Sequence, residues 1–146
     1  MASENYLNAQ PDGLITRSGG KWVSEKLDYL ERYMNMFTTS MQKKPWRAVN
    51  YIELFAGPGK YHIEETDQIV LGSPLISLLL RQSFTRYYFV ELDEERLDAL
   101  KTRCSSSSLK DRIKYYQGDC NDVVFKIVDE LNNLNAKNLG GHQWEC

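Results

Sequence analysis

The feature that most constrains the fold is an alternation of short apolar segments with helical patterns. Residues 48–55, 86–92 and 113–117 have the length and the apolar, aromatic or β-branched content of buried strands. Each is followed by a segment with helical signals, at about 73–82, 93–104 and 122–134. Strands that alternate with helices form parallel sheets with crossover helices. We therefore predict an α/β fold around a parallel sheet.

A long amphipathic helix is expected ahead of the first strand, from Trp22 to about Met41. Its apolar residues recur at intervals of four and three, which places them on one helical face: Val23, Leu27, Leu30, Met34, Phe37 and Met41. Such a face indicates packing on the core, with a partner groove or coiled coil as the alternative. Further along, Ser73 and Asp93 are the expected N-caps of two later helices, and residues 60–71 are expected to be a polar connection.

The domain organisation follows from these patterns. Residues 1–20 are polar and glycine-containing and are expected to be a flexible arm, residues 21–135 form the single α/β domain, and residues 136–146 form an irregular tail. The net charge of −2 excludes the strongly basic domain of a dedicated nucleic-acid binder, although a basic cluster at 43–47 leaves nucleic acid open as a partner.

Cysteine usage and hydropathy indicate the compartment. The three cysteines are odd in number and have no metal-ligand spacing, so we predict a reducing cytoplasmic environment and no metal site. No apolar run approaches the ~18 residues of a membrane span, so no membrane association is expected.

Acidic residues close all three predicted strands. Glu53 precedes a loop with Gly57 and Gly59, Glu91 ends the second strand, and Asp119 follows the third. In open parallel sheets ligands bind beyond the carboxyl ends of the strands, so these side chains should gather at one site. There Glu53 suits an ammonium or sulfonium charge, Glu91 a ribose diol and Asp119 an exocyclic amine. Taken alone, Glu91 or Asp119 could be only a helix cap, and the glycine loop could be an ordinary strand-to-helix turn.

The loop glycines lack the spacing of a dinucleotide fingerprint or a phosphate loop, which disfavours a nicotinamide or flavin protein. The segment 53–59, Glu-Leu-Phe-Ala-Gly-Pro-Gly, instead resembles motif I of class I S-adenosylmethionine-dependent methyltransferases. Over residues ~20–135 the chain is similar to the three-Cys-motif partner protein (TcmP) family. The segments that carry this similarity are Trp22 with Glu25–Leu27, Tyr51–Gly59, Gly72–Leu75, Phe89–Glu91 and Gly118–Asn121.

The resemblance implies a Rossmann-like parallel sheet of the class I methyltransferase type, of which this chain has the first three β-α units after an N-terminal amphipathic helix. It implies S-adenosyl-L-methionine as the cofactor. Glu53 would face its methionine end, Glu91 its ribose hydroxyls and Asp119 its adenine. The full set of implied cofactor contacts is Glu53, Phe55, Ala56, Gly57, Gly59, Glu91, Leu92, Asp119 and Cys120. No catalytic residue is assigned.

The chain also departs from this family. A class I sheet usually has seven strands, and its fourth strand ends in an Asp-Pro-aromatic type motif, whereas residues 138–146 show neither a strand pattern nor that motif. We therefore expect an S-adenosylmethionine-binding, methyltransferase-like protein of TcmP type that is truncated before its substrate motif and inactive on its own, with an open methyl acceptor. The alternative is a non-enzymatic interaction or regulatory module on a degenerate methyltransferase scaffold.

Two protein partners are expected from the same reasoning. The family resemblance implies a three-Cys-motif protein. The outer side of the first strand would be an exposed parallel edge, which favours self-association.

Overall fold

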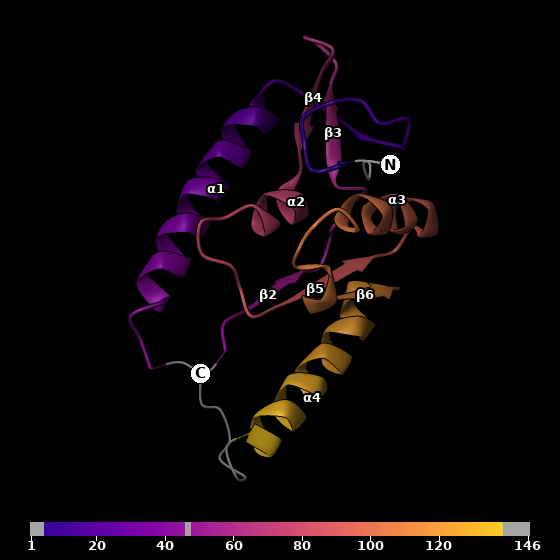
Figure 1. Ribbon diagram of the computed structural model, residues 1–146. Helices are drawn as coiled ribbons and strands as arrows, with labels where there is room; N and C mark the ends of the chain where they lie inside the picture. Colours follow the sequence, from indigo (N-terminus) through magenta and orange to yellow (C-terminus); the bar gives the residue numbers. More distant parts are fainter. Residues whose placement is uncertain (1–4, 46–47, 139–146) are drawn as a thin grey trace.

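A computed structural model describes residues 5–45 and 48–138, in which four helices surround two small sheets (Figure 1). The main sheet contains β2 (Asn50–Glu53), β5 (Arg86–Glu91) and β6 (Ile113–Gln117). Its strand order is β2-β5-β6, and both pairs are parallel. The predicted α/β architecture with a parallel sheet is confirmed, although β2 is shorter than the segment 48–55 from which it was predicted.

Helices cover both faces of this sheet. The helices are α1 (Trp22–Met41), α2 (Ser73–Leu78), α3 (Glu94–Cys104) and α4 (Cys120–Asn138). The alternation of β5 explains the two layers: Tyr87 and Phe89 join the core with α1, α2 and α3, whereas Tyr88 and Val90 pack against α4. Figure 1 shows α4 on the opposite side of β5 and β6 from α3.

The sequence signals predicted α1 and α3 well, whereas α2 ends at Leu78 instead of about residue 82 and α4 spans Cys120–Asn138 instead of about 122–134. α1 spans the predicted residues, and the Asp93 carboxylate accepts from the backbone N–H of Arg96 as the expected N-cap of α3. The prediction that Ser73 caps α2 was wrong. Gly72 occupies the cap position, because α2 begins at Ser73 itself, and the Ser73 hydroxyl donates to the Glu53 carboxylate.

A second sheet occupies a region expected to be an irregular polar connection. β3 (Lys60–Ile63) and β4 (Gln68–Leu71) form an antiparallel hairpin, and β1 (Arg17–Gly19) pairs with β3 in parallel. The prediction for residues 60–71 failed because the acidic turn of the hairpin dominates the composition of this segment. Asp67 takes a positive φ of 56° in that turn, a conformation that Asp adopts more readily than most residues.

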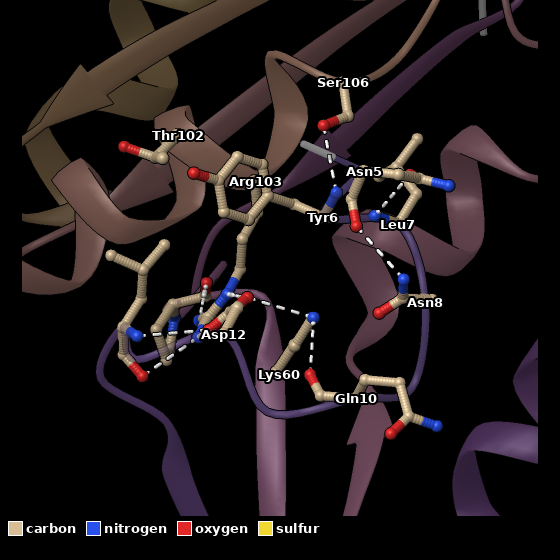
Figure 2. Close-up of polar contacts among 12 residues, drawn as sticks. Asn5, Tyr6, Leu7, Asn8, Gln10, Asp12, Lys60, Thr102, Arg103 and Ser106 are labelled. Atoms are coloured by element: carbon tan, nitrogen blue, oxygen red, sulfur yellow. Dashed lines mark hydrogen bonds and ion pairs between the residues drawn. The ribbon is translucent and has the colours of Figure 1, made fainter. Parts of the chain in front are cut away.

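The N-terminal segment makes fixed contacts, in contrast to the expected flexible arm. Arg103 of α3 is fully buried and donates to both Asp12 carboxylate oxygens at 2.9 and 2.8 Å (Figure 2). It also donates to the carbonyls of Leu14 and Ile15. Lys60 donates to the Gln10 carbonyl at 2.9 Å and lies 3.0 Å from Asp12. Burial alone would raise the pKa of Asp12, but the hydrogen bonds from Arg103 and Lys60 hold it well below its usual range.

At the other end of the chain, α4 continues to Asn138, past the predicted start of the tail at residue 136. The rest of the predicted tail, residues 139–146, lies outside the described residues. Within residues 5–45 and 48–138, no helix combines the length and hydropathy that a membrane crossing requires.

Candidate functional site

Two cavities meet beyond the carboxyl ends of the parallel strands, where the sequence placed a ligand site. The first, of about 620 Å³, lies between β1, the start of α1 and the end of β2, and Glu53 lines it. The second, of about 360 Å³, lies beyond the ends of β5 and β6. Arg17, Leu54 and Phe55 line both cavities. Together the two cavities form one trough, which we call the strand-end trough.

The second cavity gathers most of the predicted contacts. Its lining includes Phe55, Glu91, Leu92, Asp119 and Cys120. Phe55 and Leu92 are 72% and 68% exposed, although large apolar side chains are usually buried. Exposed apolar surface beside charged groups can hold a small polar molecule, and the flat face of the Phe55 ring suits an aromatic base.

Glu91 has a structural role that its position at a strand end did not reveal. One carboxylate oxygen accepts from the backbone N–H of Gly57 at 3.0 Å, and the other accepts from that of Asp93 at 2.8 Å. Glu91 is 8% exposed, so these bonds connect the glycine loop to the end of β5. Each carboxylate oxygen has two lone pairs, which leaves acceptor capacity on the side that lines the second cavity.

The glycine loop is held by backbone hydrogen bonds, and Ala56, Gly57 and Gly59 do not line the trough. Ala56 donates its N–H to the Val90 carbonyl at 2.9 Å, and Gly59 accepts from Gly72 at 2.7 Å. Gly59 has a φ of 99°, and a Cβ there would lie 3.1 Å from Leu100, so only glycine fits. Among the predicted contacts, Ala56, Gly57 and Gly59 therefore shape the loop, and none of them lines either cavity.

Glu53 lies at the other end of the trough as part of a small hydrogen-bonded group. The Tyr51 hydroxyl donates to one carboxylate oxygen at 2.9 Å, and the Ser73 hydroxyl donates to the other. Burial raises the pKa of the Glu53 carboxyl to about 7, although both hydrogen bonds act in the opposite direction. A cationic group brought beside this carboxyl would favour its ionised form.

Asp119 and Cys120 sit where β6 gives way to α4. An Asp119 carboxylate oxygen accepts from the backbone N–H of Asn121 at 2.8 Å, which is the capping role that its sequence position left open. Asp119 remains exposed and lines the second cavity with Cys120. Its carboxylate is therefore both a local cap and a free acceptor at the cavity wall.

The sequence missed one prominent residue of the trough. Arg17 comes from β1, within the segment expected to be a flexible arm, and it lines both cavities. No local signal marked it, because its position depends on the pairing of β1 with β3. Arg96 of α3 was missed as well, and it lines the second cavity while its guanidinium lies 3.8 Å from Asp93.

A different hollow, of about 740 Å³, runs along the second half of α1 and has a basic lining. Its charged side chains are Arg32, Lys43, Lys44 and Arg81. It contains none of the predicted contacts and lies away from the strand ends. Within the described residues, no group of three or more His, Cys, Asp or Glu side chains could hold a metal ion.

Models of protein families, searched along the whole chain, give no match. Characterised protein sequences give none either. The function is therefore argued from the geometry of the strand-end trough.

Proposed function

We propose that the strand-end trough binds S-adenosylmethionine and that the chain is the cofactor-binding part of a Rossmann-like methyltransferase domain of the class I, TcmP type. The observation that carries this proposal is the order of side chains along the trough. Asp119, Leu92 and Glu91 line the second cavity, Phe55 lines both cavities, and Glu53 lines the first. This order matches a ligand with a base, a ribose and a cationic amino-acid end.

Each part of that ligand has a chemically suitable neighbour. The exposed faces of Phe55 and Leu92 suit the flat base, and Asp119 can accept from its exocyclic amine. Glu91 can accept from the ribose hydroxyls with its remaining lone pairs. A carboxyl at Glu53 suits the positive charge of the sulfonium and ammonium groups.

The parallel order β2-β5-β6 supports the same proposal. Ligands of open parallel sheets bind beyond the carboxyl ends of the strands, where the second cavity lies; the first cavity runs along β2 and reaches that end at Glu53. Methyl transfer needs a cofactor held in line with its acceptor and shielded from water, so binding and positioning are the contributions we assign to these residues. The methyl acceptor stays outside this proposal.

Calorimetric titration with S-adenosylhomocysteine tests the proposal. Phe55→Ala should weaken binding by about 5- to 150-fold, because stacking of a base on an aromatic ring contributes about 1–3 kcal/mol. Phe125→Ala is the matched control, since Phe125 is the same side chain, is 71% exposed and lies on α4 outside both cavities. Saturable binding that is weakened only by Phe55→Ala supports the site, whereas equal effects of the two variants would contradict it.

A second candidate is an interaction module that keeps the fold without the cofactor. One observation favours it: Trp22, Tyr29, Tyr33 and Met36 are 61% to 69% exposed and their spacing places them on one face of α1. Exposed apolar surface of this kind often marks a protein interface. This candidate expects folded protein to show no binding of S-adenosylhomocysteine, so the same titration separates the two functions.

A further inference from the structure

The cation that the two cavities share is Arg17, and its surroundings leave it free for a ligand. Its guanidinium lies 5.9 Å from the centre of the Tyr61 ring. A Cβ at Gly57 would lie 4.0 Å from an Arg17 guanidinium nitrogen, so the group reaches the glycine loop. Within residues 5–45 and 48–138, no carboxylate forms an ion pair with it.

The segment that carries Arg17 is fixed from both sides. Upstream, Asp12 is held by Arg103, which also donates to the Pro58 carbonyl of the glycine loop at 2.7 Å (Figure 2). Downstream, the carbonyl of Gly19 accepts from the Glu64 N–H at 3.2 Å. The buried Arg103 thus connects the N-terminal segment to the glycine loop. These contacts fix the backbone position of Arg17 beside that loop.

Arg17 and Glu53 line the same cavity, where Arg17 carries a positive charge and Glu53 can carry a negative one. The α-carbon of an amino acid carries an ammonium group and a carboxylate, which need an acceptor and a donor on adjoining walls. Glu53 supplies the acceptor, and the planar fork of an arginine matches a carboxylate through two parallel hydrogen bonds.

Each cavity has one further cation in its lining. Lys26 lines the first cavity, where its ammonium lies 5.7 Å from the centre of the Trp22 ring. Arg96 lines the second, and its guanidinium lies 3.8 Å from the Asp93 carboxylate. Neither lines both cavities.

We propose that Arg17 binds the α-carboxylate of the amino-acid part of S-adenosylmethionine while Glu53 receives its α-ammonium. This inference rests on the proposed function and deepens it. It makes the N-terminal segment part of the cofactor site, and it assigns the first cavity to a zwitterionic amino-acid group rather than to a phosphate or a second nucleoside.

Two ligands that differ at this end provide the test. S-adenosylhomocysteine carries the amino-acid group, and 5′-methylthioadenosine lacks it. Arg17→Gln should weaken the binding of S-adenosylhomocysteine by about 10- to 100-fold, as expected for loss of hydrogen bonds to a charged group. The variant's affinity for 5′-methylthioadenosine should stay within about 2-fold of the wild-type value. Arg17→Lys keeps the charge without the fork and should fall between wild type and Arg17→Gln.

Arg96→Gln is the matched control, because it removes the same charge from the far end of the trough. This variant should change the affinities for S-adenosylhomocysteine and 5′-methylthioadenosine by the same factor. Arg17 is exposed, so its variants should melt at the wild-type temperature, and this is checked before titration.

The possible results separate the two proposals. If wild type binds both ligands and Arg17→Gln leaves S-adenosylhomocysteine unchanged, or weakens both ligands equally, the role of Arg17 is overturned while the cofactor site stands. If folded wild type binds neither ligand, the proposed function and the inference both fail.

Discussion

Replacing Glu53 with Gln should stabilise this protein, and the gain should depend on pH. Glu53 is held by the hydroxyls of Tyr51 and Ser73, and burial raises its pKa from 4.5 to about 7. A glutamine carries one acceptor oxygen and one donor group, as a protonated carboxyl does. Glu53→Gln therefore reproduces the neutral form in its present surroundings without the charge that burial disfavours.

The sign and size follow from the pKa. A carboxyl with a higher pKa in the folded protein binds its proton more tightly there, so its contribution favours folding below about pH 4.5 and is lost as pH rises through 7. The full difference between these limits is at most about 3 kcal/mol. Glu53→Gln should accordingly match wild type near pH 4.5 and exceed its free energy of unfolding by up to about 3 kcal/mol at pH 8.

Urea unfolding of both proteins across this pH range, without ligand, measures the difference directly. Other titrating groups are common to the two proteins and cancel in the comparison. A difference between variant and wild type that stays constant from pH 4.5 to 8, or that falls as pH rises, would refute the half-buried, weakly acidic Glu53 inferred from the structure.

Three further predictions concern the frame of the site. Arg103→Met should lower the free energy of unfolding by about 3–5 kcal/mol, since it removes two hydrogen bonds to the Asp12 carboxylate and three to backbone carbonyls, and a loss under about 1 kcal/mol in urea unfolding would contradict the network. Gly59→Ala should cost about 1–3 kcal/mol by the same assay and more than Gly57→Ala, because an added Cβ meets a side chain at 3.1 Å at position 59 and nothing closer than 4.0 Å at position 57. Burial raises the pKa of the Cys104 thiol to about 12, so iodoacetamide at pH 8 should label Cys120 well before Cys104, and equal labelling by peptide mass spectrometry would count against the packing of α3.

Local sequence patterns, within single helices and strands, predicted most of the secondary structure. The four-and-three spacing of apolar residues gave α1 its correct bounds, and the aromatic run from Arg86 gave β5. Asp93 was recognisable as a cap because its acceptor role is satisfied three residues away, by Arg96.

Contacts between residues far apart in sequence escaped prediction. Arg103 meets Asp12 across 91 positions, and no local pattern in either segment indicates the partner. That network and the pairing of β1 with β3 hold the N-terminal segment in place. The formation of β1 and the placement of Arg17 depend on both.

For the candidate site, the sequence predicted which residues gather but not how they are hydrogen-bonded. The rule that ligands bind at strand ends brought Glu91, Leu92 and Asp119 into one cavity, as expected. The rule does not say how each side chain is bonded, so the hold of Glu91 on Gly57 and the pairing of Glu53 with Ser73 became visible only in three dimensions.

The most direct test of the account is to add S-adenosylhomocysteine to ¹⁵N-labelled protein and follow the backbone amide signals. The account predicts saturable shifts at Gly57, Leu92 and Cys120, which lie in or beside the strand-end trough, and unchanged signals at Asn35 and Thr39 in the basic hollow along α1. Shifts confined to the hollow, or a spectrum of folded protein that does not respond at all, would contradict cofactor binding at the strand ends.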